Sequence, residues 1–449
     1  MRSVPENYWR RLAADLMGDH VLGEATEGGQ VRMSPTRRYR GTYIIGQPGT
    51  GKTTLIENMV LQDIRADHGL ALITPERDTI VDHILPLIPR ERWDDVVYIN
   101  PAESPVPFNP LHLGRSEDLD LKADETMTIL QRLFGDQTGT STPRMDTILR
   151  HCIHTLMQIP DSTLLDIERL LDREDHSFRT WALSRIPDER DRAFWASTYP
   201  RYPKDAHHAV TNRLDRFLQP LAIRRLLCAK GQSFDLRRAM DSGKILLFVI
   251  SDGALGRLNA ELVGQLIVAK FQLATMSRFD TPEEYRRPFY VYIDEFQTFC
   301  NQAVASYDTM LSRARKYRAP LILAHQQIGQ IADGLMRGIF GTVSTIISFA
   351  VGDADARRLA REMGIGPESL RYLPIGQCYC RVGGKLYSMK TEPPAQAGDP
   401  GASEQIVRQS RERFGAPHTG GQSGPESTAK QEKSDSPNLD DLDPGQVFS

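Results

Sequence analysis

The sequence predicts an α/β fold: a parallel sheet with an all-helical insertion and a disordered tail. Short continuous apolar runs alternate with helix-like segments, which is typical of strands buried on both faces of a parallel sheet. A glycine-rich motif directly follows the first run, and a pair of acids directly follows a later one. Between these parts, residues 111–241 carry apolar residues at helical spacing and no convincing strand.

The glycine-rich motif at residues 46–53 reads Gly-Gln-Pro-Gly-Thr-Gly-Lys-Thr and follows the apolar run Thr42–Ile45. It fits the P-loop pattern at every fixed position. Its glycines let successive N–H groups point inward around phosphates, at the positive end of a helix that should start near Lys52. Lys52 supplies a positive charge, and the Thr53 hydroxyl is a ligand for Mg²⁺. The predicted nucleotide-binding residues are Gly46, Gln47, Pro48, Gly49, Thr50, Gly51, Lys52, Thr53 and Thr54.

Further apolar runs of strand length lie on both sides of the helical insertion, at 69–74, 96–100, 244–250, 289–293, 320–324 and 344–350. We therefore divide the chain into an N-terminal extension, a nucleotide-binding domain in two segments, an all-α insertion domain and an acidic tail: 1–40, 41–110 with 242–391, 111–241 and 392–449. A helix is expected over 8–17. The tail is rich in Gly, Pro, Ser, Gln and acids, and is expected to be disordered.

Two carboxylates, Asp294 and Glu295, end the run Phe289–Ile293 in the form of a Walker B element. Asp294 is expected to hold Mg²⁺ opposite Thr53. Glu295 is expected to polarise the water that attacks the γ-phosphorus. Two acids at a strand end mean little alone, but after a P-loop they fit an ATPase of the additional-strand type.

The next run, 320–324, ends in polar residues that include Gln326. In additional-strand ATPases this strand lies between the two Walker strands, so a polar residue at its tip faces the γ-phosphate. Gln326 is the candidate for that sensor. The alternative is that the polar residues only open a loop.

Four cations fall at 313–318, near the expected end of a helix: Arg313, Arg315, Lys316 and Arg318. Three interpretations stay open. The cations complement the helix macrodipole, one of them is an arginine finger that reaches the nucleotide of a neighbouring subunit, or they contact DNA phosphates.

The cysteines form neither a disulfide framework nor a zinc pattern. Cys378 and Cys380 are expected on one face of a strand, as small buried side chains. His151, Cys152 and His154 lie close together in an apolar helical stretch. A metal site there is the less favoured interpretation.

Charge and hydropathy limit the partners of the chain. The net charge is −3, but residues 391–449 hold ten acids and five cations, so the rest is nearly neutral. A ring-shaped motor can line its pore with a few basic loops, so this balance does not exclude DNA. The longest apolar run, 245–250, is far shorter than the roughly 18 to 20 residues of a membrane span. With no secretory signal in the first ten residues, a cytoplasmic protein is expected.

Together these residues resemble the coupling-protein ATPases of type IV secretion and conjugation (TraG/TraD-like), within the HerA/FtsK superfamily of DNA-pumping motors. The resemblance covers residues 37–391. Besides the P-loop and the helical insertion, its marks lie at Asn-Pro 100–101, Phe-Asn-Pro-Leu 108–111, Phe-Asp-Leu 234–236, Gly-Lys-Ile-Leu-Leu 243–247, Asp-Glu-Phe-Gln 294–297, Ala-Arg-Lys-Tyr 314–317 and Ala-His-Gln 324–326.

The resemblance implies a RecA-like additional-strand P-loop NTPase that uses ATP and Mg²⁺. Such a protein assembles as a homo-hexameric ring and moves single- or double-stranded DNA through its pore, independently of sequence. It makes Arg315 the finger and Gln326 the sensor. Membrane-anchored members begin with transmembrane helices, which are not found here, so work at a secretion channel requires a membrane-anchored partner subunit. The other interpretation is a soluble relative that serves a mobile element, DNA processing or phage defence.

An ATPase that powers protein export or the assembly of a secretion complex is the alternative, because it shares every phosphate-site residue. The near-neutral charge of residues 1–390 mildly favours it, whereas the resemblance favours DNA more strongly. A small-molecule kinase is disfavoured, because the adjacent Asp294 and Glu295 suit water activation.

Overall fold

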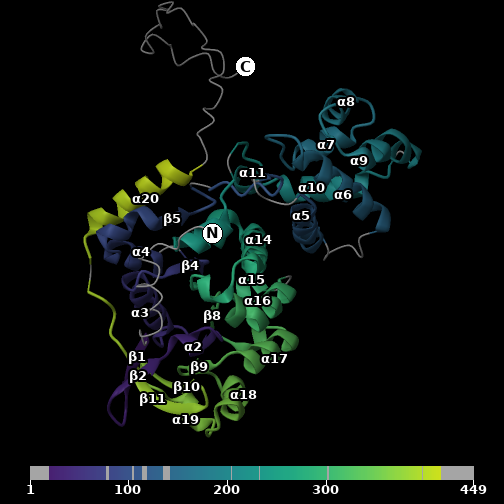
Figure 1. Cartoon of the computed structure of the whole chain (residues 1–449). Coiled ribbons are helices and arrows are strands. Elements are labelled where there is room, and N and C mark those ends of the chain that lie inside the picture. The colour runs from purple at the N-terminus through teal and green to yellow at the C-terminus, as the bar shows by residue number, and fades with distance from the viewer. Residues whose placement is uncertain are drawn as a thin grey trace, which may run out of the picture. The chain divides into compact units, whose positions relative to one another are not determined.

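The computed structural model (Figure 1) describes residues 20–76, 80–103, 106–113, 119–134, 142–203, 205–231, 233–300, 303–396 and 398–415. Its centre is an 11-stranded sheet with the order β2-β1-β11-β10-β9-β3-β8-β7-β4-β6-β5. The strands are β1 (His20–Ala25), β2 (Gln30–Met33), β3 (Thr42–Ile45), β4 (Gly69–Thr74), β5 (Val96–Ile99), β6 (Ile245–Val249), β7 (Phe289–Ile293), β8 (Leu321–His325), β9 (Thr345–Ser348), β10 (Gln377–Val382) and β11 (Lys385–Thr391).

In the order of the sheet, the consecutive strands β9-β3-β8-β7-β4-β6-β5 are parallel and form its core. Every residue of these strands is buried, which explains their continuous apolar sequences. Strand β8 lies between β3 and β7. The predicted α/β fold with an additional strand between the two Walker strands is therefore confirmed.

Helices pack on both faces of this sheet. On one face, Met59 of α3 belongs to a buried cluster with Ile44 and Leu72. On the other face, Phe271 of α14 packs on Phe248, with a ring-centroid distance of 5.8 Å. The helices of this part are α2 (Pro35–Arg38), α3 (Lys52–Arg65), α4 (Ile80–Ile84), α13 (Asp252–Leu255), α14 (Arg257–Met276), α15 (Gln297–Cys300), α16 (Val304–Tyr317), α17 (Asp333–Thr342), α18 (Asp353–Met363) and α19 (Glu368–Arg371).

Two antiparallel hairpins extend the sheet beyond β9. In β10, Cys378 and Cys380 are both fully buried, which confirms that they share one strand face. Gly383 and Gly384 form the tight turn to β11 with positive φ angles of 55° and 89°, a conformation that favours glycine. The hairpin of β1 and β2 is not among the strands expected from the sequence. Its strands are short and of mixed polarity, and β1 pairs with β11 near the other end of the chain.

The segment between β5 and β6 is helical, and its described residues contain no strand. Its helices are α5 (Leu119–Phe134), α6 (Pro143–Met157), α7 (Asp166–Leu171), α8 (Ser177–Leu183), α9 (Glu189–Ala193), α10 (His208–Leu218), α11 (Leu221–Leu227) and α12 (Leu236–Ser242). Local signals set several ends: the Asp235 side chain caps α12 by accepting a hydrogen bond from the Arg238 N–H, and Gly243 ends this helix in the left-handed conformation. The boundaries of the insertion domain stay a prediction.

The C-terminal segment corrects one expectation. Disorder from residue 392 onward is wrong over residues 400–414, which form helix α20 (Pro400–Phe414). Ile406 is fully buried, and the Ser410 hydroxyl accepts a hydrogen bond from the Tyr98 N–H of β5 at 2.7 Å. These contacts stabilise a helix whose buried positions, four residues apart, are hidden in the average composition of the tail. Residues 416–449 lie outside the described part of the chain.

The helix expected over residues 8–17 also lies outside the described residues. Among the helices that the structure describes, none combines the length and apolar character needed to cross a membrane.

Candidate active site

The carboxyl ends of β3, β8 and β7 meet at one edge of the sheet. Ile45 at the end of β3 pairs with His325 of β8, and Ile293 at the end of β7 pairs with Leu323 of β8. The residues that follow these ends therefore come together, although they lie far apart in the sequence. They include the P-loop, the Walker B pair and Gln326.

The P-loop connects β3 to α3 with the geometry that its glycines allow. Gly49 and Gly51 have φ angles of +73° and +114°, in the left-handed region that side chains rarely adopt. A Cβ atom on Gly46 would lie 2.6 Å from the Phe349 Cβ atom, so the loop also requires glycine for close packing. Helix α3 begins at Lys52, as predicted. Gln47, Pro48 and Gly49 are exposed, so the outer part of the loop is open to a ligand.

Lys52 is buried beneath the loop. Its Nζ atom donates hydrogen bonds to the Gly46 and Gln47 carbonyl oxygens at 2.7 and 3.2 Å. Burial lowers the pKa of the Lys52 ammonium group. The negative charges of Glu295 and Asp294 partly oppose this effect, because they act to raise the same pKa. The structure thus places the predicted phosphate-binding cation beside the Walker B acids. Thr53 and Thr54 follow in the first turn of α3, both partly buried.

Asp294 is held at the end of β7 and is 8% exposed. Its N–H donates to the Ile73 carbonyl oxygen of β4, and its Oδ1 accepts a hydrogen bond from the Glu295 N–H. Burial and the neighbouring Glu295 charge raise the pKa of Asp294 to about 7, whereas Lys52 acts to lower it. A nearby cation favours the ionised carboxylate, which suits the predicted role as a Mg²⁺ ligand.

Glu295 and Gln326 are in direct contact. The Gln326 Nε2 atom donates a hydrogen bond to Glu295 Oε1 at 2.8 Å, and the Gln297 Nε2 atom donates to Glu295 Oε2 at 2.6 Å. Glu295 has a φ angle of +47°, an uncommon conformation for a residue with a side chain. Two amides and an unusual backbone turn therefore fix the carboxylate. A role for Gln297 was missed, although Gln297 stands in the Asp-Glu-Phe-Gln segment.

His325 and Tyr43 form a buried pair beneath the tip of β8. The His325 Nε2 atom and the Tyr43 hydroxyl are 2.5 Å apart, and the imidazole is fully buried. Burial, with the nearby Lys52 charge, lowers the pKa of His325 to about 3, so the ring is neutral. His325 also packs on Phe296, with ring centroids 4.9 Å apart. These contacts tie the segments that carry Gln326 and Glu295 to the core.

Glu76 is a third acid near the site that the sequence analysis missed. It follows the end of β4, the strand that neighbours β7, and its N–H donates to the Thr74 hydroxyl. Its negative charge acts on the pKa values of both Lys52 and Asp294. The sequence contains a signal for Glu76, because an acid that follows a parallel strand lies at the same edge of the sheet as the P-loop. The sequence does not show that β4 lies next to β7.

The structure does not bring Arg315 to these residues. Arg315 is exposed near the end of α16, and the carbonyl oxygen of Arg318 there accepts a hydrogen bond from the Phe289 N–H at the start of β7. Because the P-loop follows the carboxyl ends of the parallel strands, Arg315 lies at the opposite edge of the sheet from its own P-loop. A catalytic role for Arg315 therefore requires the nucleotide of another subunit.

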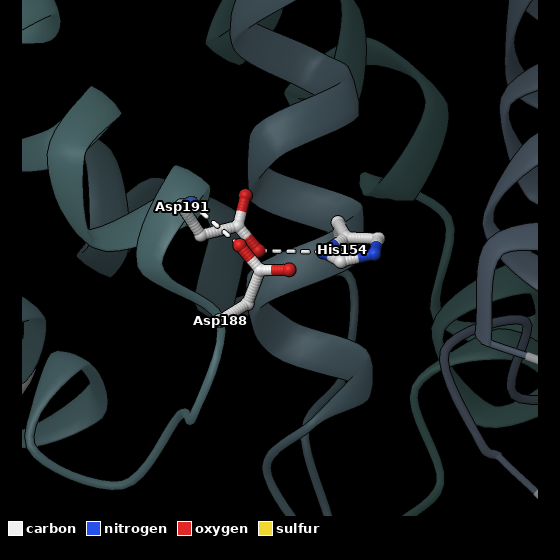
Figure 2. A group of neighbouring side chains, drawn as sticks. All are labelled: His154, Asp188 and Asp191. Carbon is white, nitrogen blue, oxygen red and sulfur yellow. Dashed lines mark hydrogen bonds and ion pairs between the residues drawn. The ribbon is translucent and has the colours of Figure 1, made fainter.

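A second cluster of ionisable side chains lies in the helical segment (Figure 2). His154 on α6 faces Asp188 and Asp191 at the start of α9, with one ligand-type atom of each within 4.8 Å of the others. Asp191 accepts hydrogen bonds from His151 at 2.8 Å and from His154 at 2.5 Å. Cys152 packs into the core instead, so His151, Cys152 and His154 do not converge. The two imidazoles compensate the buried Asp191 carboxylate.

This cluster predicts a pH-dependent stability. The hydrogen bond to Asp191 raises the pKa of His154 above 6.5 in the folded protein. The protonated His154 therefore stabilises the fold fully below about pH 6.5, and this stabilisation is lost as the pH rises through the raised pKa. We expect His154→Gln to lower the Tm by about 2 °C or more near pH 6, with a difference that shrinks above about pH 8. Thermal unfolding across this range, with the exposed His208→Gln as control, checks the prediction. A difference independent of pH would contradict it.

No protein-family model matches the sequence, and no curated protein matches it significantly. Among solved structures, VirB4 of Thermoanaerobacter pseudethanolicus has a TM-score of 0.57 at 17% identity, over 84% of this chain and 97% of that one. The bacterial conjugative coupling protein TrwBΔN70 has a TM-score of 0.57 at 13% identity, over 88% and 94%. TrwB in complex with the non-hydrolysable ATP analogue ADPNP gives 0.56 at 14%, over 88% and 94%.

The similarity therefore extends over most of each chain. The predicted resemblance to type IV secretion and conjugation proteins is confirmed at the level of the fold. This chain has the P-loop ATPase fold that VirB4 and TrwB share.

Proposed function

We propose that this protein is an ATPase that binds MgATP in its P-loop. The observation that carries the proposal is the contact of Gln326 with Glu295, at the edge where Lys52 and Asp294 also lie. A polar residue that only opened a loop would not need to hold a carboxylate from the neighbouring strand. The open glycine loop above a buried ammonium group fits a chain of phosphates.

Each residue then has a distinct role in hydrolysis. Lys52 and N–H groups of the glycine-rich loop and of the first turn of α3 bind the phosphates, and Thr53 with Asp294 would hold Mg²⁺. Bound Mg²⁺ would neutralise charge on the phosphate oxygens. Glu295 orients and polarises the attacking water, because its carboxylate is fixed by two amides. Gln326, in contact with Glu295, connects the state of the γ-phosphate to the position of the base.

We further propose that the protein works on DNA as a motor in a homo-hexameric ring. TrwB, a conjugative coupling protein, shares its fold. In such a ring, a head-to-tail interface would bring the exposed Arg315 to the nucleotide of a neighbouring subunit. DNA contacts would be made to phosphates, and hence would depend weakly on sequence and strongly on salt.

A second candidate is an ATPase that powers protein export or the assembly of a secretion complex. VirB4 shares the fold equally well. Outside residues 391–449 the chain is nearly neutral, which gives DNA little general attraction. Both candidates use the same phosphate site. Only the polymer on which the ATPase acts, DNA or protein, separates them.

Steady-state ATP hydrolysis of the purified protein tests these proposals. The reaction is measured at low and moderate salt, without DNA and with single- or double-stranded DNA, with Glu295→Gln as blank. We expect one DNA form to stimulate hydrolysis several-fold, by an amount that falls as salt rises. Hydrolysis that neither DNA form changes would overturn the DNA motor and favour the protein-handling ATPase. No hydrolysis above the blank under any condition would contradict the ATPase itself.

A further inference from the structure

An exposed apolar segment lies next to the P-loop and has no part in the site described so far. Tyr372 and Ile375 are 76% and 78% exposed, the two highest values among the large apolar side chains of the described residues. Such side chains are costly to leave in water, and a pair of them on one short loop indicates a contact surface. The question is what covers them.

Both ends of this loop are fixed beside the P-loop. At its end, the Gly376 N–H donates a hydrogen bond to the Thr50 carbonyl oxygen at 2.9 Å. A Cβ atom on Gly51 would lie 3.2 Å from the Gly376 Cα atom. At its start, the Leu370 carbonyl oxygen accepts a hydrogen bond from the Val351 N–H. Ala350, which precedes Val351 in the chain, accepts a hydrogen bond from the N–H of Gln47 in the P-loop. Residues 372–375 therefore lie between two ends that are hydrogen-bonded to the P-loop or to its neighbouring segment.

The loop lies on the side of the P-loop away from the catalytic acids. In the sheet, β8 and β7 follow β3 in one direction, and β9 and β10 follow it in the other. Glu295 and Gln326 come from the first side, whereas the loop joins α19 to β10 on the second (Figure 1). A triphosphate with its γ-phosphate toward Glu295 directs its nucleoside to the opposite side. This is the side on which Tyr372 and Ile375 are exposed.

A cation lies beside the Tyr372 ring. The guanidinium carbon of Arg371 lies 5.1 Å from the ring centroid, and Arg371 also pairs with Glu368 at 3.3 Å and Asp353 at 3.5 Å. An exposed aromatic ring and a branched apolar side chain on one short loop have the chemistry that contacts a planar base.

We propose that Tyr372 and Ile375 form the contact surface for the base and ribose of the bound nucleotide. The inference rests on the nucleotide site proposed above and adds the nucleoside end to it. The contacts are mainly apolar and read no specific pattern of base donors and acceptors, so adenine and guanine nucleotides should bind with similar affinity.

The test compares a nucleotide with a triphosphate that lacks a nucleoside. Binding of the ATP analogue ADPNP and of inorganic tripolyphosphate, each with Mg²⁺, is measured by calorimetry for the full chain and for Tyr372→Ala and Ile375→Ala. We expect each variant to weaken ADPNP binding at least about fivefold and to leave tripolyphosphate binding unchanged. Phe279→Ala, which removes a 68% exposed aromatic ring outside this loop, should change neither.

Three results would overturn the inference. Wild-type protein that binds ADPNP no more tightly than tripolyphosphate would show that the nucleoside makes no contact. Equal ADPNP binding by the wild type and both variants would place the base elsewhere. Variants that change only the oligomeric state in light scattering would assign the loop to a subunit interface. Wild-type protein that binds neither ligand would contradict the nucleotide site itself, which separates that failure from the others.

Discussion

Replacement of Glu295 by glutamine should leave ATP binding intact and lower the rate of hydrolysis by at least about 100-fold. The change keeps the shape of the side chain but removes the charge that polarises water. It also leaves one amide facing another, because Gln297 and Gln326 both donate to the present carboxylate. The measurement is single-turnover hydrolysis beside equilibrium binding of labelled ATP.

Glu404→Gln is the matched control, because Glu404 is an exposed glutamate on α20 outside the site. It should hydrolyse ATP at the wild-type rate. A Glu295→Gln protein with wild-type activity would refute the role in water activation. A Glu295→Gln protein that no longer binds ATP would show that Glu295 acts in binding instead.

Lys52→Ala should weaken nucleotide binding on the order of 100-fold, because it removes charge-assisted hydrogen bonds to the phosphates. It also leaves Asp294 without the cation that favours its ionised form. Calorimetric titration with ADPNP measures the loss. Lys390→Ala, which removes an exposed cation from β11, is the control and should bind as the wild type does. Unchanged affinity in Lys52→Ala would refute the P-loop assignment.

The same variant tests Arg315 in trans. If Arg315 completes the site of a neighbouring subunit, mixed oligomers of Lys52→Ala and Arg315→Ala should regain part of the hydrolysis that each variant alone lacks. The gain comes from interfaces that combine an intact Lys52 with an intact Arg315 from different chains. Mixed oligomers without any recovery would leave the end of α16 as a helix terminus or a DNA contact.

The predictable part of the site depends on local sequence. The P-loop, Asp294 and Glu295 directly follow apolar strands, so motif and strand could be recognised together within a few residues. Gln326 could be placed because the strand before it has a fixed position in additional-strand proteins. The sheet then confirmed that position, with β8 between β3 and β7.

The unpredicted part depends on contacts between distant segments. Glu76 joins the site only because β4 lies beside β7. Gln297 acquires a role only through the turn that directs it at Glu295. The helix α20 is stabilised by its packing against β5, and the hairpin of β1 and β2 by the pairing of β1 with β11. None of these neighbours is visible in the local pattern of the chain.

The order of strands also has a consequence for synthesis of the protein on the ribosome. Strand β3, which carries the P-loop, borders β8 and β9, and both are made after the whole helical segment. Strand β1 can pair with its neighbour β11 only later still, because β11 ends at Thr391. In the nascent chain, backbone N–H and C=O groups of β1 and β3 therefore stay unpaired until the late strands emerge. During this time they must not pair with strands of other chains. Protection by a chaperone during elongation suits this topology better than folding in step with translation.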